Sequence, residues 1–350
     1  DIHTDAIFFI PGSYTDNSTD GDGKIILAGT LIVNGDISNN GVTTLIAKPA
    51  NPGIQYLTGT GDQTLTVNTA DTTYLSNFFL SKPSGSFILP FKKNVLFGQK
   101  LTFSSGKISL VSSPVYLKYG GALVSESLAS RFTGIGFVST KVPAVTTDTE
   151  NFNIAGMGLI VDIGSDGMGA SVVTRHHIPA GIKRFDVAND ATILKYFEIT
   201  FGEEAGIFDN MTFSFFSGTE EMNSLGSSEL AVYTSSDNGS SWLMLDAVVP
   251  SGSSSITNSN VKFEANSTNL IVVAETCDND HKPKAVPISS NSSALIQEGN
   301  TTIKVCYGGE LDLSSTADYH HWIVNGVVIP SSSVDTYIFD LTDPATDGAK

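Results

Sequence analysis

Short runs of β-branched and aromatic residues, each ended by turn-forming residues, fill residues 29–124. The breaks come too often for helices of ordinary length, so the pattern predicts short strands separated by turns such as Asn-Gly, Ser-Gly and Gly-Gly. One short coil cannot bury its apolar face alone, and the repetition therefore predicts a β-solenoid of β-helix-like coils in residues 1–140. The segments that carry the pattern are residues 29–41, 63–73, 76–89, 94–110 and 113–124.

Two features interrupt this pattern. Asp16, Asp20 and Asp22 lie in an acidic loop whose carboxylates suit Ca²⁺, but the position where an EF-hand needs Glu carries Leu27. A solvated turn is the better interpretation, and no metal site is predicted. Residues 81–85 contain a proline, which cannot donate to a central ladder, and are expected to form a loop.

Residues 141–276 follow a different pattern, with longer strands that alternate more clearly between apolar and polar residues. The segments are SVVTRHHI, ILKYFEITF, MTFSFFSG, ELAVYTSS, WLMLDAVV and NLIVVAET. Alternation with a turn every ten or so positions is typical of antiparallel sheets that have one solvated face. These residues are predicted to form an antiparallel β-sandwich.

Residues 277–350 are predicted to be a linker followed by a truncated immunoglobulin-like β-sandwich. Trp322 and Val324 share one face of a predicted strand, and the following Asn-Gly predicts a hairpin turn. An immunoglobulin-like domain needs about 100 residues, more than remain here, so a longer parent protein is expected. Because Asp1 rather than Met opens the chain, we interpret it as a mature or excised product.

Composition makes several classes of partner unfavourable. The 350 residues include 36 acidic and 19 basic residues, which gives a net charge of −17. Such a chain is repelled by nucleic acid and by anionic membrane surfaces. No run of about 18 apolar residues occurs, so no direct membrane insertion is expected. No cofactor is predicted.

The two cysteines, Cys277 and Cys306, are too few for a four-ligand zinc site and form a candidate disulfide. This bond would close a loop of about 30 residues and contribute roughly 3 kcal/mol by restricting the unfolded chain. The alternative is that Cys306 pairs with a cysteine beyond Lys350.

Four residues match the Asp-box turn found in sialidases and many β-propellers: Ser235, Asp237, Gly239 and Trp242. In that motif the Asp and Ser side chains hydrogen-bond to the local backbone, and the Trp packs beneath the turn. A catalytic propeller needs several copies and a cluster of arginines, whereas this chain has one copy. The motif is therefore predicted to be a structural turn.

Arg175, His176 and His177 form the most conspicuous polar cluster. Adjacent histidines on a strand point to opposite faces, so no metal site is predicted here. Arg175 and one histidine are expected to form hydrogen bonds at a sheet edge or a domain joint. The Glu pairs at 203–204 and 220–221 are interpreted as solvated loop charges, and no catalytic residue is predicted.

Motifs in all three segments resemble large secreted surface proteins of the Bacteroidetes. TLTV, FFLSKPSGSFIL and KLTFSSGKISL resemble their N-terminal region, and VCYGGELDLSSTADYHHWIVNGVVIP resembles their immunoglobulin-like repeats. NIAGMGLIV, SVVTRHHIPAGIKRFDV, ILKYFEI, FSFF and SELAVYTSSDNGSSW are similar in order and spacing to a module recurrent in that group. The resemblance implies an extracellular protein that is exported by the type IX secretion system and used in adhesion or gliding motility.

The strand pattern and the lack of convergent catalytic groups predict a non-enzymatic adhesin, in which many weak contacts add up through effective concentration. The resemblance implies that it is attached to the bacterial outer membrane. Its expected partners are an extracellular surface or glycan ligand and the secretion and anchoring machinery of the outer membrane. The alternative is a glycan-processing enzyme or its carbohydrate-binding accessory region. A flat strip of exposed Tyr56, Tyr74, Tyr116 and Tyr119 would favour that alternative. A third hypothesis is that the chain is a passive spacer that binds no ligand.

Overall fold

The protein is all-β, with strands joined by turns and two short 3₁₀ segments, η1 (Ile154–Gly156) and η2 (Glu220–Met222), in the described part. Five C-terminal strands are described without the segments between them. Before those strands, the computed structural model describes residues 2, 6–17, 25–40, 46–47, 53–68, 72–146, 148–178, 192–202, 206–217, 220–223, 225, 229–239, 242–250, 252–263 and 265–275.

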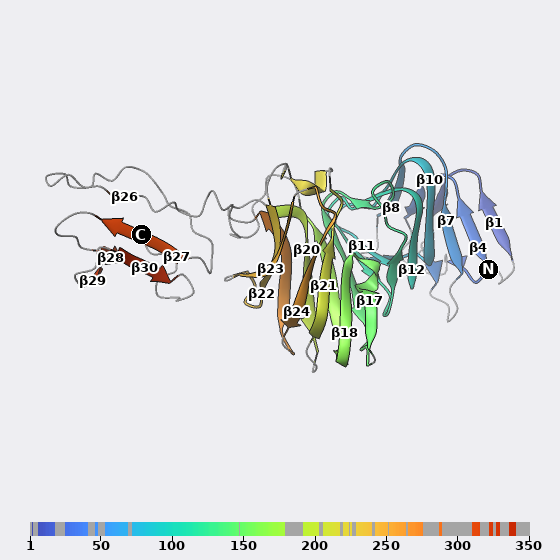
Figure 1. Ribbon diagram of the computed structural model, residues 1–350. Helices are drawn as coiled ribbons and strands as arrows, with labels where there is room; N and C mark the ends of the chain where they lie inside the picture. The colour runs from blue at the N-terminus through green and yellow to red at the C-terminus, as the bar shows by residue number, and fades with distance from the viewer. Residues whose placement is uncertain are drawn as a thin grey trace.

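The N-terminal part is a solenoid of stacked parallel strands, as the sequence predicts (Figure 1). Its first face carries β1 (Ile7–Ile10), β4 (Thr30–Val33), β7 (Ile54–Leu57), β10 (Asn77–Ile88), β12 (Lys100–Ser109) and β14 (Ala122–Val124). The second face carries β2 (Tyr14–Asp16), β5 (Ile37–Asn39), β8 (Gln63–Val67), the second halves of β10 and β12, and β15 (Phe132–Thr133). The third face carries β9 (Thr72–Tyr74), β11 (Asn94–Phe97), β13 (Ser113–Leu117) and β16 (Gly136–Val142). A further short parallel pair joins β3 (Ile25–Ile26) to β6 (Ile46–Ala47).

Each coil takes about two dozen residues. On the first face Ile7 pairs with Thr30, Thr30 with Ile54 and Ile54 with Asn77, steps of 23 or 24 residues. Alternate side chains of each strand point inward, and the interior is filled by aliphatic and phenyl groups. Phe78 lies 5.5 Å from Phe87 and 5.2 Å from Phe97, ring centre to ring centre, so side chains from all three faces meet in one core.

The expectation of a loop at residues 81–85 is wrong, because β10 continues through them. The ladder between β10 and β12 is nevertheless interrupted between Ser81 and Ser86, where the chain passes from the first face to the second. Pro83 lies inside this interruption and therefore removes no paired donor from the ladder.

β16 joins the solenoid to the rest of the chain. It pairs in parallel with β13 and antiparallel with β19 (Ser171–His177), so the third face continues without a break. The predicted boundary between residues 140 and 141 falls inside this strand. Figure 1 shows the green and yellow strands following directly on the coils. The strands β20 (Thr192–Phe201), β25 (Thr268–Glu275), β22 (Glu229–Ser235) and β23 (Leu243–Pro250) complete a nine-stranded sheet.

A second, four-stranded antiparallel sheet packs against this extension. Phe197 on β20 contacts Phe213 at 5.1 Å between ring centres, and Phe201 stacks on Phe263 at 5.9 Å. These side chains belong to the same continuous apolar core as the solenoid interior. The strands of the second sheet are β17 (Thr149–Asn153), β18 (Leu159–Met168), β21 (Gly206–Ser214) and β24 (Ser255–Phe263).

The C-terminal strands form two small sheets. β27 (Glu310–Ser315) pairs in parallel with β26 (Pro287–Ile288) and antiparallel with β30 (Thr336–Asp340). β28 (Trp322–Val324) and β29 (Val327–Ile329) pair antiparallel, as expected for the predicted Asn-Gly hairpin. Cys277 and Cys306 lie outside the described residues.

Candidate functional site

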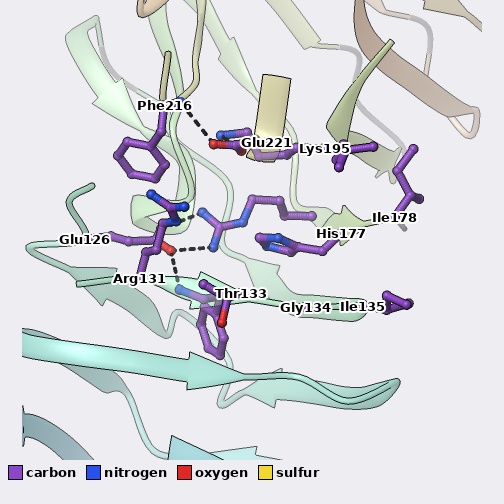
Figure 2. A pocket seen from close by; sticks show the side chains of 13 residues that line it. Glu126, Arg131, Thr133, Gly134, Ile135, His177, Ile178, Lys195, Phe216 and Glu221 are labelled. Carbon is purple, nitrogen blue, oxygen red and sulfur yellow. Dashed lines mark hydrogen bonds and ion pairs between the residues drawn. The ribbon is translucent and has the colours of Figure 1, made fainter. Parts of the chain in front are cut away.

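A cavity of about 370 Å³ lies where the last solenoid coil meets the antiparallel strands. Its lining comes from the segment between β14 and β16, from β19 and β20, and from the chain that follows β21 (Figure 2). The volume falls in the range of small-molecule pockets, roughly 300–1,000 Å³. The charged and titratable lining residues are Glu126, Arg131, Arg175, His177, Lys195 and Glu221.

A buried ion pair between Arg175 and Glu126 crosses from the antiparallel strands to the solenoid. Arg175 Nη1 lies 2.6 Å from Glu126 Oε2, and Nη2 lies 2.9 Å from Oε1. The two side chains are only 2% and 8% exposed. Arg175 Nη1 also donates to the Met157 carbonyl at 3.0 Å, and the Phe132 N–H donates to Glu126 Oε1 at 3.0 Å. This two-pronged geometry fixes both side chains.

A second buried pair joins Lys195 to Glu221. Lys195 Nζ lies 2.9 Å from Glu221 Oε1 and donates to the Ser214 carbonyl at 2.8 Å. Burial lowers the pKa of Lys195, and the charge of Glu221 opposes that shift. Interpreting Glu221 as a solvated loop charge is wrong, since its side chain is 10% exposed. The Phe216 N–H also donates to Glu221 Oε2 at 3.0 Å, and this hydrogen bond turns the carboxylate inward.

Arg131 supplies a third cation to the lining. It is 5% exposed, it donates from Nη1 to the Leu128 carbonyl at 2.8 Å, and its guanidinium lies 5.1 Å from the Phe216 ring centre. Figure 2 shows its head group beside Phe216, near Glu126. The lining therefore holds three cations and two carboxylates, although the whole chain has a net charge of −17.

His177 is a neutral imidazole in this lining. Burial holds its pKa well below the usual value of 6.5, and the charges of Arg175, Lys195, His176 and Arg131 lower it further. Its Nε2 atom is buried and has no hydrogen-bond partner among the described residues. Arg175 forms its hydrogen bonds with Glu126 where β19 meets the last solenoid coil, which is one of the two places expected for it.

His176 has different surroundings from His177, as expected for neighbours on a strand. Its ring stacks on Tyr196 with 4.3 Å between centres, and its Nε2 lies 3.5 Å from Glu198 Oε2. Glu198 is 39% exposed, so this pair lies toward solvent. The two histidines do not converge on one site.

A second hollow, of about 340 Å³, adjoins the first and shares Glu126, Arg175, Lys195 and Phe216 with it. Gly156 lines this hollow in a left-handed conformation, with φ of +66°. A Cβ atom at this position would lie 1.9 Å from the Leu123 carbonyl oxygen. The close approach packs η1 against β14 and closes the solenoid beneath the ion pairs.

The Asp-box residues make local contacts in a turn between β22 and β23. Ser235 Oγ donates to Asp237 Oδ1 at 2.7 Å and accepts from the Gly239 N–H at 2.8 Å. Trp242 is 7% exposed, and its Nε1 donates to the Gly239 carbonyl at 3.2 Å. These contacts tie the turn together, and none of these residues lines the cavity.

The four tyrosines do not form one exposed strip. Tyr74 is buried at 2% exposure, and Tyr56 lies on β7, in a different sheet from Tyr74 and Tyr116. Tyr116 on β13 and Tyr119 remain exposed, at 38% and 60%. The ring of Tyr116 meets that of Phe137 on β16 edge to face at 5.7 Å.

Within the described residues, no group of three or more His, Cys, Asp or Glu side chains is placed to hold a metal ion. Asp20, Asp22, Glu203 and Glu204 lie outside that part of the chain. None of the described helical segments is long and apolar enough to cross a membrane.

Glu126, Arg131 and Lys195 are functional candidates that the sequence reasoning missed. Lys195 carries a usable signal, because it stands between Ile193 and Phe197 on a face of β20 that is otherwise apolar. Glu126 carries no such signal in the sequence, since its partner Arg175 is 49 residues away. A scan against protein-family models and searches of curated proteins and of solved structures gave no match.

Proposed function

We propose that this chain is the binding part of a non-enzymatic, extracellular adhesin, exported by the type IX secretion system and held at the bacterial outer membrane. The observation that carries the proposal is the solenoid that continues through β16 into the antiparallel strands as one sheet. An elongated body whose main apolar core runs from the solenoid into the antiparallel strands suits the display of a binding surface away from a cell. Many copies then attach through weak contacts to a surface or glycan.

The ion pairs and hydrogen bonds of the cavity carboxylates support a binding role over catalysis. Glu126 and Glu221 are each held by a buried cation and by a backbone N–H. A general acid or base must be free to reach a bound substrate, whereas the oxygens of these two carboxylates are already engaged by protein donors. This pairing supports binding rather than turnover.

The architecture of residues 141–276 and 277–350 is also a proposal. We infer that residues 141–276 form an antiparallel β-sandwich, supported by the phenyl contacts between the two sheets. Residues 277–350 are proposed to be a linker and an incomplete immunoglobulin-like domain, supported by the pairing of β27 with β30 and of β28 with β29.

The test is attachment by the purified chain displayed at high density on beads. Beads are expected to adhere to polysaccharide-coated surfaces, whereas the soluble monomer competes only at high concentration, because adhesion depends on multivalency. No release of reducing ends is expected from a polysaccharide panel. Turnover of any member of the panel, or equal binding by single and clustered copies, would contradict the proposal.

A carbohydrate-binding accessory region of a glycan-processing enzyme is the second candidate. Tyr116 and Phe137 on the third solenoid face, together with the exposed Tyr119 in the turn after β13, favour it, since aromatic rings stack on sugar rings. Tyr119→Ala is expected to weaken binding to a glycan array if this face is the site. Leu128→Ala, at a comparably exposed apolar residue, serves as the control.

A further inference from the structure

We propose that the cavity between the last solenoid coil and β19–β20 binds a small neutral ligand that carries a hydroxyl group on an apolar body. The proposal concerns this cavity alone and does not depend on the attachment function. It rests on two buried nitrogens without partners, on the pairing of the charged lining residues and on the apolar walls.

Two side-chain nitrogens of β19 have unused hydrogen-bonding capacity. Nε of Arg175 and Nε2 of His177 are both buried, and neither has a hydrogen-bond partner in the described part of the chain. The two residues are two positions apart on one strand, so their side chains leave it on the same face, and both line the cavity. Buried polar groups are normally satisfied by protein, water or ligand. These nitrogens therefore mark the place where the polar group of a ligand binds.

A hydroxyl group matches both nitrogens. The Arg175 Nε–H can only donate, so it needs an acceptor. His177 is neutral, because burial and, to a lesser degree, nearby positive charges hold its pKa well below 6.5. A neutral imidazole nitrogen either donates or accepts, according to its tautomer. A hydroxyl oxygen accepts through its lone pairs and donates its proton, so it serves Arg175 together with either form of His177.

The charged side chains of the lining already have partners. Glu126 holds Arg175 and Glu221 holds Lys195, each at ion-pair distance. Arg131 is likewise engaged, by a backbone carbonyl and by an aromatic ring. A charged ligand would lose its hydration at a place where the protein charges are in use, which is costly. The lining therefore favours a neutral ligand.

The remaining walls are apolar. They include Phe132, Ile135, Ile178, Leu194 and Phe216. Figure 2 shows Ile135 and Ile178 together on the side away from Glu126 and Arg131. A ligand that fits this arrangement has its hydroxyl group at one end and an apolar body at the other.

The volume limits the size of the ligand. A water molecule occupies roughly 30 Å³ in the liquid, so a cavity of about 370 Å³ holds a ligand of roughly a dozen heavy atoms. Phenols and small aromatic alcohols fall below this limit. A monosaccharide also fits by size, but most of its hydroxyl groups would face apolar walls and lose their hydrogen bonds to water.

The experiment is a saturation-transfer NMR titration of the chain with phenol, toluene and benzoate around 1 mM, the affinity range expected for ligands of this size. Phenol and toluene have nearly the same shape and differ mainly in the hydroxyl group. We expect phenol to bind at least about tenfold more tightly, because toluene excludes water from both nitrogens and leaves them unpaired.

Three results of this titration would overturn the proposal. Binding of phenol no tighter than that of toluene overturns the role of the hydroxyl group. Tighter binding of benzoate than of phenol overturns the neutral ligand in favour of an anion. Absence of a signal from all three probes overturns the assignment of a ligand site.

Two variants localise the binding. Ile135 lines the cavity at 42% exposure, so Ile135→Trp fills the cavity while folding is retained, and the phenol signal disappears. Val248 lies on β23, outside the lining, at 41% exposure, and Val248→Trp is the matched control that keeps the signal. Unchanged phenol binding in Ile135→Trp overturns the assignment to this cavity.

His177→Phe tests the role of the unpartnered nitrogens. It keeps a ring of similar size and removes Nε2, so phenol is expected to lose about tenfold in affinity while toluene does not. His176→Phe is the matched control, because the His176 ring stacks on Tyr196 and does not line the cavity, and it binds phenol as the parent does. Thermal unfolding verifies that each variant is folded. Equal phenol affinities in folded His177→Phe and in its control contradict the role of this nitrogen.

Discussion

The ion pair between Glu126 and Arg175 gives the sharpest prediction about stability. Glu126→Gln removes the charge while keeping the size of the side chain, so Arg175 is left as a buried cation without its partner. The pair has two contacts, of 2.6 and 2.9 Å, and side-chain exposures of 2% and 8%. Removal of one partner from such a buried pair costs about 3–5 kcal/mol. We expect the lower end, because the amide oxygen can still accept from the Phe132 N–H.

Urea-induced unfolding, followed by tryptophan fluorescence and circular dichroism, measures the loss. Arg175→Met is expected to destabilise the chain by a similar amount, since it leaves Glu126 unpaired. The double variant then loses less than the sum of the two single losses by about 2 kcal/mol or more, because no buried charge of this pair remains.

Glu198→Gln is the control. Its partner His176 lies 3.5 Å away, but Glu198 is 39% exposed, so the expected loss is at most about 1 kcal/mol. Additive losses of unfolding free energy from Glu126→Gln and Arg175→Met would refute the idea that this ion pair holds the antiparallel strands against the solenoid. A loss from Glu126→Gln no larger than that from Glu198→Gln would refute it as well.

Three further predictions concern single residues. The folded-state pKa of His177 is below its unfolded value, so the unfolded state binds the proton first as the pH falls. The free energy of unfolding is therefore unaffected by this group above about pH 6.5 and decreases below it by up to about 1.4 kcal/mol per pH unit. His177→Gln should remove that part of the slope in unfolding curves recorded from pH 8 to 5. Gly156→Ala forces a Cβ toward the Leu123 carbonyl at positive φ and should cost at least about 2 kcal/mol in urea unfolding. Ser235→Ala removes the hydrogen bond to Gly239, and the expected loss of about 1 kcal/mol appears in the thermal midpoint.

Each of these predictions has its own contradicting result. An unchanged pH slope in His177→Gln would mean that the imidazole titrates normally in the folded protein. Gly12→Ala, where a Cβ meets nothing within 4 Å, is the control for Gly156→Ala, and equal effects would contradict the close approach. A Ser235→Ala variant as stable as the parent would show that the turn does not depend on this hydroxyl.

The repetition of strands and turns was sufficient to predict the solenoid but not its coil length. Val95 pairs with Val115, 20 residues on, whereas Ile37 pairs with Leu65, 28 residues on. Turns absorb this variation, so no fixed period appears in the sequence. Pro83 misled the prediction because a corner between faces has the same composition as a loop.

The cavity could not be predicted, because its residues meet only through long-range pairing. Antiparallel pairing of β16 with β19 brings Arg175 opposite Val138 and thereby next to the solenoid's last coil, where Glu126 lies. A Glu pair after a strand looks solvated in sequence, and only the turn of η2 directs Glu221 to Lys195. Sequence spacing carries no information about such contacts.

The most direct test of the account is a disulfide placed across β16 and β19, since their pairing joins the solenoid to the antiparallel strands and forms the cavity. Ser139 and Thr174 are opposite each other, with 2.8 Å between their hydroxyl oxygens. In a chain with both native cysteines changed to serine, Ser139→Cys with Thr174→Cys is expected to form a disulfide on air oxidation, because directly opposed residues match disulfide geometry. Non-reducing peptide mapping detects it. The control pair, Ser139→Cys with Val172→Cys, is two residues out of register and should stay reduced. Equal cross-linking of the two pairs, or no cross-link between positions 139 and 174, would contradict the pairing of β16 with β19.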